Sequence, residues 1–90
     1  ELPFRTNLIG EHNAFNLATA AAVALSSGAA PDALKEALAE PFAIPGRLEG
    51  FILPSGAKAF VDYAHSEDAL FRVLSALKPL SKGSLINLFG

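Results

Sequence analysis

The sequence has 90 residues, of which 51% are hydrophobic and 18% charged, and its formal net charge is −2. This length allows one small domain, and this composition excludes a chain that stays unfolded for want of apolar residues. There is no cluster of Lys and Arg, so the electrostatic surface of a nucleic-acid-binding protein is missing. Cys is absent as well, which removes disulfides and thiolate metal sites and fits a cytosolic protein.

Neither a membrane span nor a signal peptide is expected. No apolar run approaches the roughly 20 residues that cross a bilayer. The first five residues lack the basic stretch and apolar core of a signal peptide. The chain contains no Met, so we expect it to begin within a longer protein.

The first half of the chain is predicted to be mainly helical. A short strand over residues 4–9 ends at Gly10, and an alanine-rich helix follows over residues 11–26. This helix is apolar almost all round after Asn16, which is typical of a helix buried on most sides. Pro31, at a first helical position, begins a second helix over residues 31–40.

The second half is predicted to contain two strands, a helix and a further strand. Residues 51–53 and 59–61 flank a turn sequence, Pro-Ser-Gly. Ser66 is a candidate N-cap for a helix over residues 67–78, whose apolar residues recur every three or four positions. A buried type of strand follows over residues 84–89. Strand, helix and strand in this order are typical of the opening of a parallel α/β sheet.

One βαβ unit cannot cover both faces of its sheet, and the two helices of the first half have no complete sheet of their own. We therefore expect an α/β chain made of two partial domains, residues 1–46 and residues 47–90, joined near Pro45-Gly46. We also expect that the two halves do not share one core.

Asn13 and Asn16 are the first candidate site residues. They are three positions apart near the start of the predicted helix, so they share one face of it. Their amides can donate and accept hydrogen bonds together, which suits the edge of an adenine ring. The alternative is that both residues only cap the helix.

Arg47 is the second candidate. It follows Pro45-Gly46 in the linker between the halves, and its planar guanidinium can bind a phosphate with two parallel hydrogen bonds. The alternative is an ordinary surface arginine paired with Glu49.

Asp62 and His65 are the third group of candidates. Asp62 comes at the end of a predicted strand, and ligands of α/β proteins bind at the carboxyl ends of strands. A carboxylate there can accept hydrogen bonds from ribose hydroxyls, and His65 lies beside a helix N-terminus, where anions are favoured. The alternative is that both side chains bond to backbone groups and shape the turn. No metal site is predicted, since His12 and His65 alone do not form one.

The order of these motifs resembles the Mur ligase family, and within it the ligases that add the third residue to UDP-N-acetylmuramoyl-L-alanyl-D-glutamate. The resemblance rests on G-x-x-N-x-x-N, an alanine-rich helix, PGRLE and VDYAH, and it covers nearly the whole chain. It implies a three-domain cytoplasmic enzyme of peptidoglycan synthesis, with a central ATP-binding domain and a C-terminal Rossmann-like domain. The chain is then the end of the first followed by the βαβ start of the second.

The resemblance also implies roles for the candidates. Asn13 and Asn16 would lie near the adenine, Arg47 would reach the phosphates, Asp62 would hold the ribose and His65 would lie close to the nucleotide. The implied cofactors are ATP and Mg²⁺, and the partners are a UDP-N-acetylmuramoyl-peptide and an amino acid. The implied reaction forms an acyl phosphate, from which an amine displaces phosphate.

No catalytic residue and no GxxxxGK[ST] phosphate loop lies within the 90 residues, so this segment alone is expected to be inactive. Two alternatives remain open. One is a ligase similar to folylpolyglutamate synthase, whose counterpart of DYAH usually reads DGAHNP. The other is a non-catalytic nucleotide-binding or adapter module.

Overall fold

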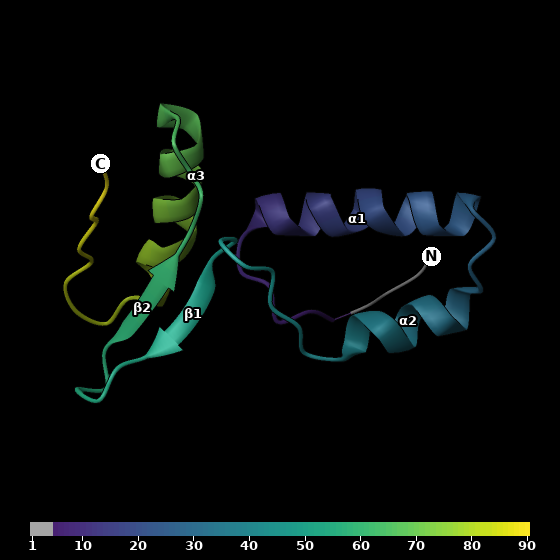
Figure 1. Ribbon diagram of the computed structural model, residues 1–90, viewed down its shortest axis with the longest axis horizontal. Helices are drawn as coiled ribbons and strands as arrows, with labels where there is room; N and C mark the ends of the chain where they lie inside the picture. The colour runs from purple at the N-terminus through teal and green to yellow at the C-terminus, as the bar shows by residue number, and fades with distance from the viewer. Residues whose placement is uncertain (1–4) are drawn as a thin grey trace.

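The computed structural model describes residues 5–90, and its elements fall into two groups (Figure 1). Helices α1 (Glu11–Ser26) and α2 (Pro31–Ala39) lie side by side in the first half of the chain. Strands β1 (Glu49–Ile52) and β2 (Lys58–Val61), helix α3 (Glu67–Leu77) and the 3-10 turn η1 (Lys78–Leu80) form the second. The molecule is elongated, with extents of 43 × 29 × 21 Å.

Both helices of the first half occupy the predicted positions. The N-cap of α1 is Gly10, whose φ of +97° is in the region that glycine adopts readily. A Cβ atom there would come within 2.6 Å of the His12 ring, so any other residue would strain the backbone and displace this ring. Pro31 begins α2, as predicted. The strand expected over residues 4–9 is wrong as far as it is described, because residues 5–9 form no strand; Phe4 lies outside the described residues.

Helix α1 is less buried than its sequence predicts. Its buried residues are Asn13, Leu17 and Ala21, which recur every four positions and form a single stripe. Phe15 and Val23, on other sides of the helix, are exposed. The expectation of burial on most sides is wrong because α2 is the only element that packs along α1 within residues 5–90.

Strands β1 and β2 form an antiparallel hairpin in which Gly50 pairs with Phe60. The turn is closed by a 2.8 Å hydrogen bond from the Gly56 N–H to the Leu53 carbonyl. Both predicted strands of this turn are therefore confirmed. Helix α3 follows, and Leu77 is the buried residue of its apolar face.

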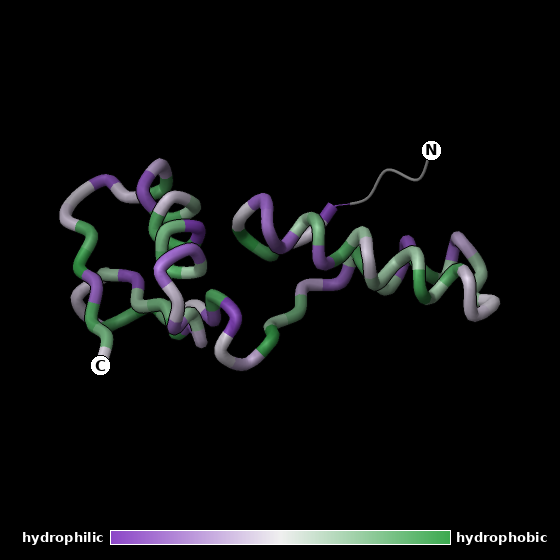
Figure 2. Tube along the Cα trace, turned by 90° about the horizontal axis from the view of Figure 1, so that it is seen from above, coloured by the Kyte–Doolittle hydropathy of each residue, from purple (hydrophilic) through white to green (hydrophobic). Residues whose placement is uncertain are grey.

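The predicted strand over residues 84–89 is wrong. These residues form no ladder with β2, and the sheet in residues 5–90 has only two strands, which run antiparallel. Ile86 and Leu88 are 86% and 95% exposed, and Figure 2 shows hydrophobic residues along this segment up to the C-terminus. A strand requires a neighbour for its backbone groups, and residues 84–89 have none here. The chain is a mixed α/β structure, but the parallel βαβ unit is not formed.

The two halves keep separate cores, as predicted. The buried apolar residues of the first half are Leu17, Ala21 and Leu38, and those of the second are Leu48 and Leu77. Within residues 5–90, no helix of the first half packs along an element of the second. Apart from the linker that joins them, the halves approach near the start of α1, where a Cβ atom on Gly10 would lie 3.2 Å from the Ala76 methyl group. None of the helices in residues 5–90 has the length and apolar character that a bilayer span requires.

Candidate functional site

The linker between the halves is a compact loop tied to the residues that follow β2. Within it, the Arg47 N–H donates to the Ile44 carbonyl at 3.0 Å. The Gly46 N–H donates to the Glu49 carboxylate at 3.1 Å, and the Gly46 carbonyl accepts from the Tyr63 N–H at 2.8 Å. We call residues 44–49 and 62–65 together the junction. These bonds attach the loop that carries Arg47 to the hairpin half.

Asp62 makes two further bonds in the junction. One carboxylate oxygen accepts from the Leu48 N–H and the other from the Ala64 N–H, each at 2.8 Å. Asp62 directly follows β2, and α3 begins only at Glu67, so its predicted position at the end of a strand is confirmed. Its predicted alternative, a carboxylate that shapes the turn, has direct geometric support.

Leu48 has the left-handed backbone conformation that side chains other than glycine rarely adopt, with φ +46°. This conformation costs about 1–2 kcal/mol for an ordinary residue. The side chain is only 7% exposed, and burying a leucine contributes about 1.5–3 kcal/mol. Its burial and the Asp62 hydrogen bond offset the backbone strain, and nothing in the sequence alone indicated it.

Arg47 is exposed. Its predicted alternative, an ion pair with Glu49, is wrong because the Glu49 carboxylate accepts from the Gly46 N–H instead. The only ion pair among residues 5–90 joins Arg72 and Asp68, so no carboxylate in this range holds the Arg47 guanidinium. The full guanidinium fork is therefore available to a ligand.

His65 lies in the same junction and is exposed. Its Nδ1 is 3.0 Å from the Tyr63 carbonyl oxygen. A carbonyl only accepts, so Nδ1 carries the proton and donates this bond. The Tyr63 ring packs edge-on against the imidazole, with centroids 5.2 Å apart. Nε2 of the neutral ring is then an acceptor, and this nitrogen donates to an anion only when the ring is protonated.

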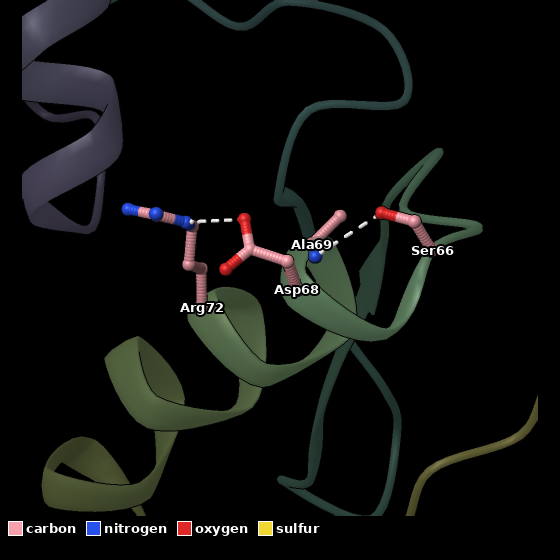
Figure 3. Close-up of polar contacts among 4 residues, drawn as sticks. All are labelled: Ser66, Asp68, Ala69 and Arg72. Atoms are coloured by element: carbon pink, nitrogen blue, oxygen red, sulfur yellow. Dashed lines mark hydrogen bonds and ion pairs between the residues drawn. The ribbon is translucent and has the colours of Figure 1, made fainter.

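Ser66 caps α3 as predicted. Its hydroxyl accepts from the Ala69 N–H at 3.3 Å (Figure 3). One turn on, Arg72 donates to the Asp68 carboxylate at 2.8 Å, and the figure shows the guanidinium extending toward α1. This hydrogen bond and the negative charge of Asp68 raise the pKa of Arg72 above its ordinary value. The pair is exposed on both sides and is therefore a weak contact.

Asn13 and Asn16 occupy different environments. Asn13 is 4% exposed, and its amide donates to the Ile9 carbonyl at 2.7 Å. Asn16 is exposed and makes no side-chain hydrogen bond within residues 5–90. The capping alternative is wrong for both, because the N-cap is Gly10 and no side chain caps α1. Asn13 instead fixes the segment before the helix, and one of its two amide N–H donors is already in use.

Asn7 was missed by sequence reasoning. Its amide donates to the Phe42 carbonyl at 2.7 Å and accepts from the Phe42 N–H at 3.1 Å. This reciprocal pair joins the segment before α1 to the segment after α2. The available signal was a lone amide directly before an apolar pair, Leu8-Ile9.

Two open hollows lie elsewhere on the surface. One, of about 370 Å³, lies where the start of α1 faces α3 and is lined by Glu11, His12, Asp68, Phe71, Arg72, Ser75 and Ala76. The other, of about 550 Å³, lies between the end of α3 and residues 81–87. None of the five candidate residues lines either hollow. Within residues 5–90 no three potential His or carboxylate metal ligands lie together.

Comparison with known proteins places the chain. It is 43% identical over 90 residues to the UDP-N-acetylmuramoyl-L-alanyl-D-glutamate–2,6-diaminopimelate ligase of Aquifex aeolicus. This alignment covers 100% of this chain and 18% of that protein. It is 36% identical over 89 residues to the same ligase of Geobacter metallireducens, covering 99% of this chain and 17% of the relative. By its sequence this chain belongs to the Mur ligase family.

A lysine-adding relative is matched as well. The chain is 39% identical over 83 residues to the UDP-N-acetylmuramoyl-L-alanyl-D-glutamate–L-lysine ligase of Streptococcus mutans, covering 92% of this chain and 17% of that protein. The chain thus spans about a sixth of the length of these Mur ligases. No protein-family profile matches it, and no solved structure does.

Proposed function

We propose that this chain is the junction between the ATP-binding domain and the C-terminal domain of an ATP-dependent Mur ligase. The full enzyme would act in the cytoplasm and add an amino acid to a UDP-N-acetylmuramoyl-peptide in peptidoglycan synthesis. The observation that carries this proposal is similarity along the whole chain to ligases that add the third peptide residue. Residues 1–46 would complete the first of these domains and residues 47–90 would begin the second.

The junction fits one part of an ATP site. Arg47 projects from a loop held by several hydrogen bonds, and its guanidinium has no ion-pair partner among residues 5–90. A guanidinium placed in this way suits the phosphates. Asp62 has two bonded oxygens, yet each carboxylate oxygen has a second lone pair. It can therefore still accept from a ribose hydroxyl, and His65 lies three residues further along the same junction.

The fit is poorer at the start of α1. The Asn13 amide is buried and donates to a backbone carbonyl, so an adenine edge could reach it only after a local rearrangement. Asn16 is exposed and suits such an edge better. We therefore propose Asn16 as the adenine contact and Asn13 as its structural neighbour.

ATP with Mg²⁺ supplies the phosphoryl group that converts a carboxylate into an acyl phosphate, from which the incoming amine displaces phosphate. Within this scheme the segment itself binds and orients. Arg47 neutralises phosphate charge, and such charge-assisted contacts in a site closed to water are among the larger contributions to catalysis. The segment alone is proposed to be inactive.

The test uses the full-length protein that contains this segment. We expect phosphate release that depends on ATP, on UDP-N-acetylmuramoyl-L-alanyl-D-glutamate and on an amino acid, with diaminopimelate and lysine compared as acceptors. Replacement of the muramoyl substrate by a folate tests the folylpolyglutamate alternative. Absence of turnover with every acceptor, together with no phosphate loop in the same reading frame, would favour the adapter alternative.

A further inference from the structure

The hydrogen bond between Asp62 and Leu48 connects the loop that carries Arg47 to the carboxylate at the end of β2. The proposed function gives Arg47 and Asp62 separate roles. Leu48 follows Arg47 and has a left-handed backbone, and its N–H donates to the Asp62 carboxylate at 2.8 Å. Leu48 is also buried. An unusual backbone conformation persists only where its surroundings determine it. The direction of the chain at Arg47 therefore depends on Asp62.

The second Asp62 oxygen strengthens this dependence. It accepts from the Ala64 N–H at 2.8 Å, so the carboxylate is held at the end of β2 and cannot turn freely away from the loop. The neighbouring Tyr63 N–H donates to the Gly46 carbonyl on the other side of Arg47. Residues 62 and 63 thus hold the backbone of the loop immediately before and immediately after Arg47.

We propose that Asp62 is a positioning residue for Arg47. It holds Leu48 in its left-handed conformation and so fixes the direction in which the guanidinium leaves the junction. This inference rests on the proposed function for the identity of the ligand, but the coupling between Asp62 and the loop does not. A ribose contact by Asp62 is a different role, and the two roles predict different results.

The first experiment reads the loop without any nucleotide. Hydrogen exchange at the Leu48 amide is measured in the full-length protein, in the Asp62→Ala variant, and in Asp68→Ala as a matched control on the exposed side of α3. We expect the Leu48 amide to be protected, and Asp62→Ala alone to speed its exchange by about tenfold or more, as loss of a hydrogen bond to a charged group predicts. An unprotected Leu48 amide in the folded wild-type protein would overturn the inference, even if Asp62→Ala does not fold.

The second experiment reads function through a double-mutant cycle of Asp62→Ala and Arg47→Ala. If Asp62 acts through Arg47, its substitution should lower kcat/KM about tenfold in the wild-type background and less than about twofold in the Arg47→Ala background. Independent, multiplicative losses in the two backgrounds would contradict the proposal.

The same variants are then assayed with 2′,3′-dideoxy-ATP, which lacks the ribose hydroxyls. A positioning role predicts that the Asp62→Ala defect persists with this nucleotide, whereas a role confined to the ribose predicts that it disappears. An inactive wild-type protein would refute the proposed function, whereas a Leu48 amide indifferent to Asp62→Ala would refute the positioning role.

Discussion

The junction and the C-terminal segment (residues 84–90) differ in where their backbone groups find partners. In the junction, the Asp62 and Glu49 carboxylates accept from the backbone of the linker loop, and Tyr63 donates to it. The C-terminal segment has a strand-like apolar sequence, yet it forms no ladder and leaves Ile86 and Leu88 exposed. Hydrogen bonds from nearby side chains suffice to order the loop, whereas a strand also requires a neighbouring strand.

This difference bears on function. A loop fixed by its own chain can present Arg47 in one direction before any ligand arrives, which lowers the entropic cost of binding. The junction is therefore the part of the chain in which substitutions should alter activity more than folding. Asn13 of α1 and Ser66 at the start of α3 should show the reverse, since their side chains bond to nearby backbone groups.

The largest effect is expected for Arg47→Ala in the full-length ligase. The exposed guanidinium supports neither core, while loss of a charge-assisted contact to phosphate removes about 1.5–3 kcal/mol of binding. This corresponds to at least about a tenfold fall in kcat/KM. Steady-state phosphate release measures it, and the thermal midpoint should stay close to that of the wild type.

Arg47→Lys is the matched variant for this experiment. It retains the charge but not the planar fork, so it should restore activity only in part. Near-normal turnover of Arg47→Ala, or a fall in its melting temperature large enough to explain the loss, would refute the role of Arg47 as a phosphate ligand.

The sequence predicted the helices and the hairpin strands better than the contacts that connect them in the junction. Helices α1, α2 and α3 and both strands of the hairpin follow from periodicity, Pro31 and the Ser66 cap. The Asp62 bond to Leu48 spans 14 positions, and no local pattern encodes a contact at that separation. The left-handed Leu48 was equally hidden, because leucine carries none of the preference for positive φ that marks glycine or asparagine. The prediction of a strand over residues 84–89 was wrong because strand propensity does not supply the neighbouring strand that pairing requires.

A smaller effect is expected for Asn13→Ala, which distinguishes the structural role of Asn13 from the role of Asn16 on the same helix. Loss of the Asn13 amide leaves the part-buried Ile9 carbonyl without its donor, which costs about 1–2 kcal/mol. Native-state hydrogen exchange of α1 amides in the full-length protein measures this local loss. Asn16→Ala, at an exposed position, is the control and should leave exchange nearly unchanged. Equal effects of the two substitutions would contradict the structural role of Asn13.

Ser66→Ala should have a still smaller effect, confined to the start of α3. The Ser66 hydroxyl accepts from the Ala69 N–H at 3.3 Å in an exposed setting, and loss of such a cap costs about 0.5–1 kcal/mol. Faster exchange of the first-turn amides of α3, with no change at Ser75→Ala on the same helix, is the expected pattern. If the Ala69 amide exchanges equally fast in the two variants, the cap contributes nothing.

The smallest effect is expected for Arg72→Gln. Asp68 and Arg72 are four residues apart, about one turn of α3. The Arg72 and Asp68 side chains are largely exposed, at 61% and 73%. Water and dissolved ions screen such a pair, and the raised pKa of Arg72 keeps the guanidinium charged throughout the physiological range. We therefore expect no resolvable change in the thermal midpoint at physiological salt, and a slight decrease only at low ionic strength. Because Arg72 also lines the hollow between α1 and α3, a clear loss of stability that persists at high salt would mean that Arg72 holds the two halves together, and the separation of their cores would then need revision.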